Sequence, residues 1–269
     1  MPGRNTETLI IGAALAWATT AGSPSAAPAA APAAAPPGAA PAKPGKSAPK
    51  TPPKSKLDLQ GLQKALESGD EARTIEALET IQKSGDAAGA PLVEALLLRG
   101  ASAAVLGRAI ETLGILAQPS SGQYLAPYAQ HRTPELRRAA LRALIATKAA
   151  NAGDVLRRAL HGNDAAQRAI AARGLGQLGV RAAVPELFSV LPKDVSEAAE
   201  SLGVLCVAEE CAKFMGLLGK LRFEVMESGM VPLLLRPQAD VSDELKLRLI
   251  ERLRRMATQP ALQLLRTAL

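Results

Sequence analysis

The stretch DAAQRAIAARGLGQLGVRAAVPELFSVL, residues 164–191, contains the pattern that decides the fold. Its heptapeptide RGLGQLG, residues 173–179, returns in related form along the chain with starts 32, 31, 31, 27 and 51 residues apart. Such a period is typical of stacked supersecondary units. The related segments are ETIQKSG (79–85), ETLGILA (111–117), RALIATK (142–148), ESLGVLC (200–206) and ERLRRMA (251–257). The last gap leaves room for one degenerate unit around residues 209–236, within a degenerate segment 207–239. Residues 222–230 fit the repeat worst.

Each heptapeptide belongs to a stripe of apolar residues at helical spacing. Around the second one, the stripe consists of Leu106, Ala109, Ile110, Leu113 and Leu116. These positions fall on one side of a helix. Aromatic residues make up only 2% of the chain, which leaves little of the material that strands favour. The sequence therefore predicts an all-α fold.

A second set of short apolar segments precedes the heptapeptides and predicts a first helix in each unit. These segments are residues 91–97, 155–160, 184–191 and 231–235. Pro91, Pro185 and Pro232 stand near their starts, where a missing N–H costs nothing. Residues able to cap the second helices stand nine positions before the heptapeptides, at Asp70, Ser102, Thr133 and Asp164. Each unit is thus expected to be helix, turn, helix, with neighbours stacked to bury the stripes.

This pattern resembles the short HEAT-like repeats of about 30 residues, the type also seen in phycobilin-lyase-like proteins, and residues 164–191 match it best. The tetratricopeptide pattern fits less well because its Trp and Gly-Tyr signatures are missing. The resemblance implies an α-α superhelix over residues 57–269, with the second helices lining its concave surface. It also leaves a lyase-like accessory role as one alternative.

The N-terminal segment is expected to direct export. Arg4 precedes an apolar run over residues 9–17, and small residues follow at 19–21, as in a secretory signal peptide. We expect residues 1–21 to be removed and the mature chain, with no transmembrane helix, to be secreted or periplasmic. The alternatives are a buried helix or an uncleaved anchor, although the run is shorter than the roughly 20 residues that span a bilayer.

Residues 22–56 are expected to form a disordered linker. They contain ten prolines and twelve alanines. Five lysines are spread over residues 43–56, and the segment has no acidic residue. Residues 57–269 hold 26 basic and 24 acidic residues, so most of the chain's net charge of +7 comes from the tail. A folded part so nearly neutral makes nucleic acid a poor candidate partner. The lysines either touch anionic surfaces or form a solvated tail.

Familiar catalytic and cofactor patterns are weak here. Gly174, Gly176 and Gly179 spell G-x-G-x-x-G, but a dinucleotide site needs a preceding strand, so we interpret them as helix packing and a helix end. His131 and His161 are the only histidines and lack the ligand clusters of metal sites. We therefore expect no cofactor, no metal and no enzymatic activity.

The two cysteines, Cys206 and Cys211, straddle an expected helix end. In an oxidising compartment they either form a disulfide or remain two neighbouring buried thiols. Because they are five positions apart, a bond would close a small loop and stabilise the chain modestly.

The main functional hypothesis rests on the column opposite the buried stripe. With Leu113 facing inward, Glu111 lies about 160° around the helix. The equivalent positions are Glu79, Glu111, Arg142, Arg173, Glu200 and Glu251. Four residues further on stand Lys83, Ile115, Ala146, Gln177, Val204 and Arg255. If this face is concave, as the resemblance implies, the groove has a basic centre between acidic ends, with apolar points nearby.

Such a groove suits a protein or peptide partner. We expect a monomeric binding scaffold that uses Glu111, Ile115, Arg142, Arg173, Glu200 and Val204. A different interpretation is that Glu111 pairs with Arg142, and Arg173 with Glu200, across stacked repeats for little energy. A second hypothesis is polyanion binding through the lysine tail and Arg137, Arg138, Arg142, Arg168 and Arg173.

Overall fold

A computed structural model describes residues 57–268, which all fall in one structural unit. The predicted signal peptide (1–21) and linker (22–56) lie outside these residues. Regular structure between residues 57 and 268 is helical throughout, apart from one isolated bridge between Leu218 and Leu221. The expected all-α architecture is thus confirmed for this part of the chain.

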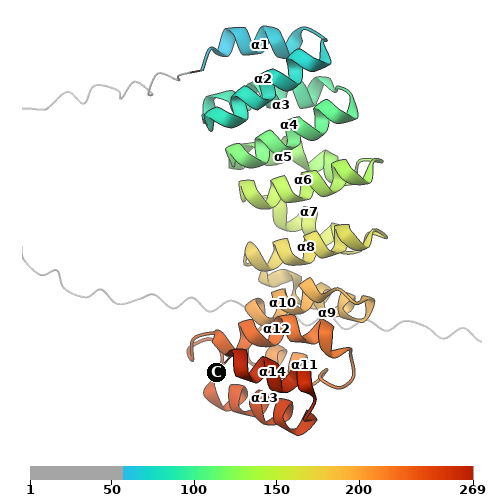
Figure 1. Cartoon of the computed structure of the whole chain (residues 1–269), viewed down its shortest axis with the longest axis vertical. Helices are drawn as coiled ribbons and strands as arrows, with labels where there is room; N and C mark the ends of the chain where they lie inside the picture. Colours follow the sequence, from blue (N-terminus) through green and yellow to red (C-terminus); the bar gives the residue numbers. More distant parts are fainter. Residues whose placement is uncertain (1–56, 269) are drawn as a thin grey trace, which may run out of the picture. The chain divides into compact units, whose positions relative to one another are not determined.

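The second helices of successive units stack into one continuous row, which we call the second-helix row (Figure 1). Each helix of the row packs against the next, so every unit covers the apolar edge of its neighbour. The row consists of α2 (Glu71–Ser84), α4 (Ala103–Leu116), α6 (Pro134–Thr147), α8 (Ala165–Gln177), α10 (Ser196–Leu205) and α12 (Phe223–Leu235).

The first helices are shorter and cover the other side of the buried stripes. They are α1 (Leu59–Glu67), α3 (Ala90–Arg99), α5 (Gly122–Leu125) continued by a 3-10 turn, α7 (Ala152–Ala159), α9 (Val184–Val190) and α11 (Ala208–Met215). Pro91 and Pro185 stand in the first turns of α3 and α9, as predicted. The five stripe residues of α4 are all buried, which confirms the periodicity argument.

The predicted N-caps also stand where expected. The Asp70 carboxylate accepts hydrogen bonds from the amides of Ala72 and Arg73, and the Asp164 carboxylate accepts two in the same way at the start of α8. The Ser102 hydroxyl accepts the amide of Val105. Thr133 occupies the N-cap of α6 without a side-chain cap bond, so here the prediction was right in position only.

Glycines let some helices of the row approach closely. A Cβ added at Gly176 would lie 2.3 Å from the Ser201 Oγ, and one at Gly203 would lie 2.1 Å from the carbonyl oxygen of Gly229. Gly179 ends α8 with a positive φ of 69°. The G-x-G-x-x-G sequence therefore serves helix packing and helix termination, and no strand precedes it within the described residues.

The prediction for residues 231–235 was wrong. They do not begin a first helix but form the last turns of α12, with Pro232 inside that helix. α12 stacks on α10, and the two helices approach closely where Gly203 lies against Gly229. Position 228, a serine, therefore takes the next place in the outward column.

Glu251 does not continue that column either. It lies on α13 (Asp243–Met256), which packs on α14 (Gln259–Ala268), while α14 packs on α12. An Arg252 Nη2 donates to the carbonyl oxygen of Leu218, 2.8 Å away, just beyond α11. Of the two residues predicted to form the acidic C-terminal end of the groove, Glu200 is therefore the one that lies on the second-helix row.

None of the helices within residues 57–268 combines the length and apolar character needed to cross a membrane.

Candidate functional site

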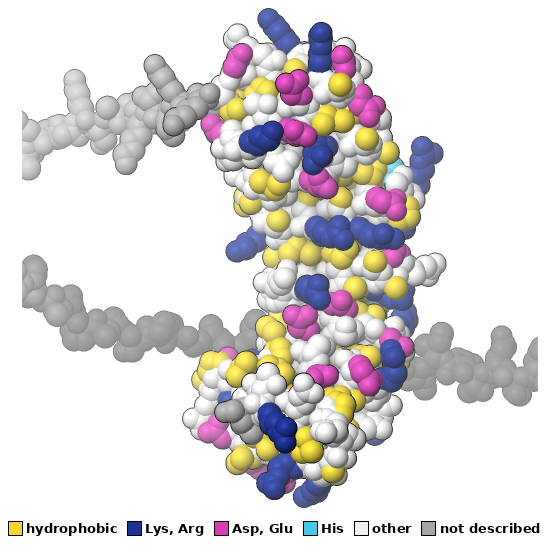
Figure 2. All heavy atoms as spheres, viewed as in Figure 1, with side chains coloured by type: hydrophobic (Ala, Val, Ile, Leu, Met, Phe, Trp, Pro, Cys, Tyr) yellow, Lys and Arg dark blue, Asp and Glu magenta, His cyan; other side chains and the backbone are white. Residues whose placement is uncertain are grey.

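The exposed face of the second-helix row carries the predicted outward column. Glu111, Arg142 and Arg173 are exposed, and Glu79 and Glu200 are half-buried. Figure 2 views this side and shows basic side chains across the middle of the row, with apolar surface next to them and acidic side chains above and below. The helices place these residues in line because equivalent heptapeptide positions stack from unit to unit.

Two apolar residues that stand four positions after members of the outward column are exposed to solvent. Ile115, on α4, is 53% exposed, and Val204, on α10, is 46% exposed. Helices α6 and α8 lie between them in the row. Ile115 and Val204 are therefore separate contact points along one face and do not form a continuous apolar patch.

Arg142 is the one member of the predicted basic centre whose charge is uncompensated. Within residues 57–268 its guanidinium makes neither a hydrogen bond nor an ion pair. Its side chain lines a depression of about 450 Å³ between α4 and α6. The wall also contains Arg108, Glu111, Glu135 and Arg138, and the small residues Ala103, Ala104, Gly107 and Ala139.

Arg173 is in a different situation. Its Nη2 lies 3.5 Å from an Oε1 of Glu197, and its Nε lies 3.5 Å from an Oε2 of Glu200. The expected Arg173–Glu200 pair is therefore present, and Glu197 adds a second acidic partner. These exposed pairs contribute little stability, but they neutralise the positive charge of Arg173.

The expected Glu111–Arg142 pair does not form. Glu111 instead lies 3.3 Å from Arg108, one turn earlier on the same helix, and Arg108 also reaches Glu79 at 3.9 Å. Arg108 and Glu197 are the site residues that the sequence analysis missed. Both lie three residues before a column member, so the i,i+3 spacing was the signal that could have identified them.

Arg138 links α6 to the start of α8. Its Nε donates to the Asp164 Oδ2 at 2.9 Å, and Asp164 is the N-cap of α8. Burial raises the pKa of the Asp164 carboxyl, but the hydrogen bond from Arg138 and the amides of Gln167 and Ala166 outweigh it, so the pKa lies below its ordinary value. The charge of Arg138 is thus largely compensated.

Two further arginines named for polyanion binding are engaged within the protein. The Arg137 guanidinium donates to the Gln167 Oε1 and to the backbone carbonyls of His131 and Arg132. Arg168 donates to the carbonyl of Gly162 at 2.9 Å. Of the five arginines proposed for this role, Arg142 alone makes no such bond among the described residues.

The two histidines lie apart. The Nδ1 of His131 accepts the amide of Thr133 at 3.1 Å, and its ring stacks near Tyr128. His161 lies beside the ion pair of Arg157 with Glu186. No group of three or more His, Cys, Asp or Glu side chains in residues 57–268 is arranged to hold a metal ion.

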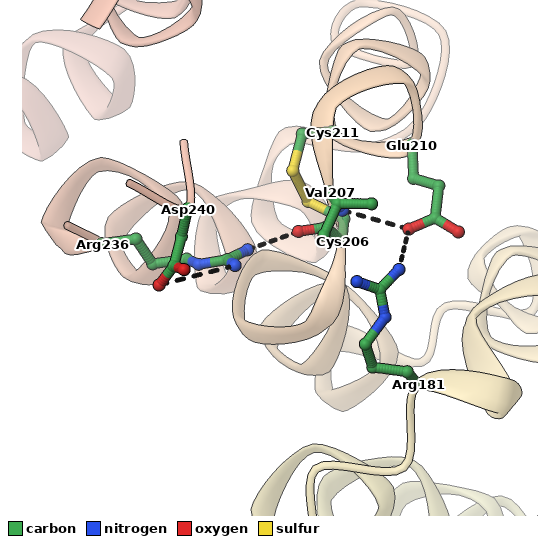
Figure 3. The surroundings of a disulfide bond; sticks show 7 residues. All are labelled: Arg181, Cys206, Val207, Glu210, Cys211, Arg236 and Asp240. Carbon is green, nitrogen blue, oxygen red and sulfur yellow. Dashed lines mark hydrogen bonds and ion pairs between the residues drawn. A yellow bond between two sulfur atoms is a disulfide. The ribbon is translucent and has the colours of Figure 1, made fainter. Parts of the chain in front are cut away.

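A disulfide joins Cys206 to Cys211 in the structure (Figure 3). It connects the end of α10 to α11 across a two-residue junction, and both cysteines are fully buried. The Glu210 carboxylate accepts the amide of Val207 at 3.0 Å and the guanidinium of Arg181 at 3.1 Å. Arg236 donates to the carbonyl of Cys206 and lies 4.0 Å from Asp240. Residues from two successive units, α9–α10 and α11–α12, therefore meet at this disulfide.

Comparison with known proteins supports the fold. No protein-family model matches the chain, and no curated protein matches its sequence. Among solved structures, the complex of CpcE and CpcF of phycocyanin lyase from Nostoc sp. PCC7120 matches with a TM-score of 0.50 and 16% identity, covering 82% of this chain and 98% of that chain. At this identity the likeness concerns the helical repeat fold alone.

Two engineered proteins also match, with TM-scores of 0.41 and 0.47 and identities of 17% and 18%. The first comparison covers 79% of this chain and 95% of that chain, and the second covers 78% and 67%.

Proposed function

We propose that this chain is an exported, monomeric scaffold that holds a segment of a partner protein along the second-helix row. The observation that carries the proposal is Arg142, an exposed arginine without a partner among the described residues, beside a depression of about 450 Å³. Arginine is enriched at protein–protein interfaces and among the residues that contribute most to binding there. Ile115 and Val204 supply the aliphatic contacts.

Photo-crosslinking in the native envelope tests this proposal. A photoreactive amino acid replaces Ile115 or Val204 in the full chain, and the adducts are identified by mass spectrometry. The matched control is Arg158, an exposed residue of α7 on the first-helix side. We expect one partner protein to be captured at positions 115 and 204 and not at 158. Capture at 158 alone would contradict the proposal.

The partner found in this way allows a second test. Replacing Arg142 and Arg173 together by Glu reverses the charge at the middle of the row, and we expect this variant to lose the partner in a pull-down. Both side chains are exposed, so the variant should keep its helical circular dichroism. Undiminished capture would mean that the partner binds elsewhere.

A lyase-like accessory role is the second candidate, because the matched complex of CpcE and CpcF belongs to a lyase. Under the scaffold proposal, protein purified from its natural source should be colourless. A bound chromophore, visible in the absorption spectrum, would favour the lyase-like role.

Polyanion binding is less well supported, because four of its five arginines already make bonds inside the protein. Counterion release predicts that binding to a polyanion weakens steeply with salt. Heparin retention that barely changes between low and moderate salt would exclude it.

A further inference from the structure

We infer that the depression between α4 and α6 receives a carboxylate side chain of the partner segment, and that Arg142 is the residue that binds it. This inference rests on the proposed scaffold function and adds the chemistry that the partner must have. It commits to a peptide segment with an Asp or Glu at one position.

The charges around the depression leave Arg142 as its free cation. Arg108 shares its charge with Glu79 and Glu111, and Arg138 is bonded to Asp164 at 2.9 Å. Glu135 stands seven residues before Arg142 on α6, about 10 Å away along the helix axis. Glu111 also lines the depression, but its carboxylate pairs with Arg108, so Arg142 is the cation of the depression that a carboxylate from outside can pair with.

The depression has room for a side chain of the partner, because several of its wall residues are small. Ala103, Ala104, Gly107 and Ala139 contribute little bulk to its wall. A planar guanidinium can bind a carboxylate through two parallel N–H···O hydrogen bonds. Ile115 lies four residues beyond Glu111 on α4 and is 53% exposed, so an apolar residue near the partner's carboxylate would have a contact there.

Arg173 provides the matched comparison. It stands at the equivalent position on α8 and is exposed, but Glu197 and Glu200 each lie 3.5 Å from its guanidinium. A carboxylate approaching Arg173 would meet these two anions. We therefore expect the preference for acidic residues to depend on Arg142 and not on Arg173.

A random peptide display library, selected against the full chain, tests the inference. We expect enriched peptides to share an Asp or Glu at one position. Arg142→Gln should weaken the binding of a selected peptide at least about tenfold, since hydrogen bonds to charged groups are strong. Arg173→Gln should change it less than about threefold. Replacing the shared acidic residue by its amide should weaken binding to the wild type and have little further effect on Arg142→Gln.

The outcomes separate the inference from the function on which it rests. If Arg142→Gln and Arg173→Gln have equal effects, or if Arg142→Gln has none while Ile115→Asp abolishes binding, the inference is wrong and the scaffold proposal stands. If no peptide is enriched, or if every selected peptide binds equally well to Arg142→Gln and Ile115→Asp, the scaffold proposal fails and the inference fails with it.

Discussion

Ion pairs between neighbouring helices determine which outward-facing charge is available to a partner. Arg142 and Arg173 occupy equivalent heptapeptide positions, so the sequence alone does not distinguish them. In the structure, Arg173 lies between Glu197 and Glu200, while Glu111 turns to Arg108 and leaves Arg142 without a partner. The sequence predicted the outward positions from Glu79 to Glu200 but not the place of Glu251. Side-chain pairing depends on distances between helices that no spacing along the chain provides.

Asp164 makes the stability of the chain dependent on pH. Its pKa is lower in the folded chain, so its carboxylate favours folding above the unfolded pKa of about 3.9. This contribution is lost as the pH falls through the folded value. We expect Asp164→Asn to lower the free energy of unfolding in urea at pH 7, and the difference from the wild type to shrink as the pH falls below the unfolded pKa.

The control is Asp154→Asn on α7, where the Asp154 side chain is 82% exposed and lies 3.9 Å from Arg157. This change should be nearly neutral throughout this pH range. An Asp164→Asn difference that stays constant with pH would contradict the assigned role of the Arg138–Asp164 bond.

The disulfide at the α10–α11 junction predicts that the oxidised chain contains no reactive thiol. Denatured without reductant, the protein should not be alkylated by iodoacetamide in a mass spectrum, whereas reduced protein should gain two adducts. Because Cys206 and Cys211 are five positions apart, replacing both with Ala should cost roughly 2 kcal/mol of stability. Two reactive thiols in protein purified from the envelope would contradict the bond.

At the scale of the helix, glycine positions set how closely the row packs. Gly203 lies against the backbone of α12, so even a methyl group there must separate two helices. Gly107 differs, because a Cβ added to it would lie 3.6 Å from the Leu136 Cδ2, an ordinary contact. The same substitution should therefore have opposite effects on α10 and α4.

We expect Gly203→Ala to lower the free energy of unfolding by about 1–3 kcal/mol through overpacking. Gly107→Ala should raise it by up to about 1 kcal/mol, because alanine is the better helix former. Thermal and urea denaturation, monitored by circular dichroism, measure both. Equal effects of the two substitutions would refute the close α10–α12 contact.

Helix boundaries were predictable where the N-cap residue, the apolar stripe and any proline in the first turn all indicated the same helix. Asp164 and the buried stripe located α8 to within a residue or two. Prediction failed at α12, because Pro232 was taken as a helix start. A proline inside a helix is normally disruptive, so its position near the C-terminal end of α12 could not be predicted from the sequence. The position of α13 was predicted wrongly. Its heptapeptide resembles the others, but α13 packs on α14 and not on a helix of the second-helix row.

At the scale of the whole chain, export is a prediction that spectroscopy can test simply. Trp17 is the only tryptophan, and cleavage near residue 21 would remove it. Protein purified from its natural envelope should therefore lack tryptophan emission and show only the weak emission of its tyrosines. Emission typical of tryptophan would mean that residues 1–21 remain attached.

The bonds around Cys206 also affect the order in which parts of the chain unfold. In a linear array each unit touches only its neighbours, so opening can begin at an end and spread. The Arg181–Glu210 and Arg236–Cys206 bonds tie the α9–α10 unit to the α11–α12 unit beside the disulfide. The first two units are also linked, by the bond from Arg99 to the Leu66 carbonyl and by the Arg108–Glu79 ion pair, but these links are not covalent. Amide hydrogens of α10, α11 and α12 should thus exchange with deuterium most slowly, and those of the terminal helix α1 should exchange first.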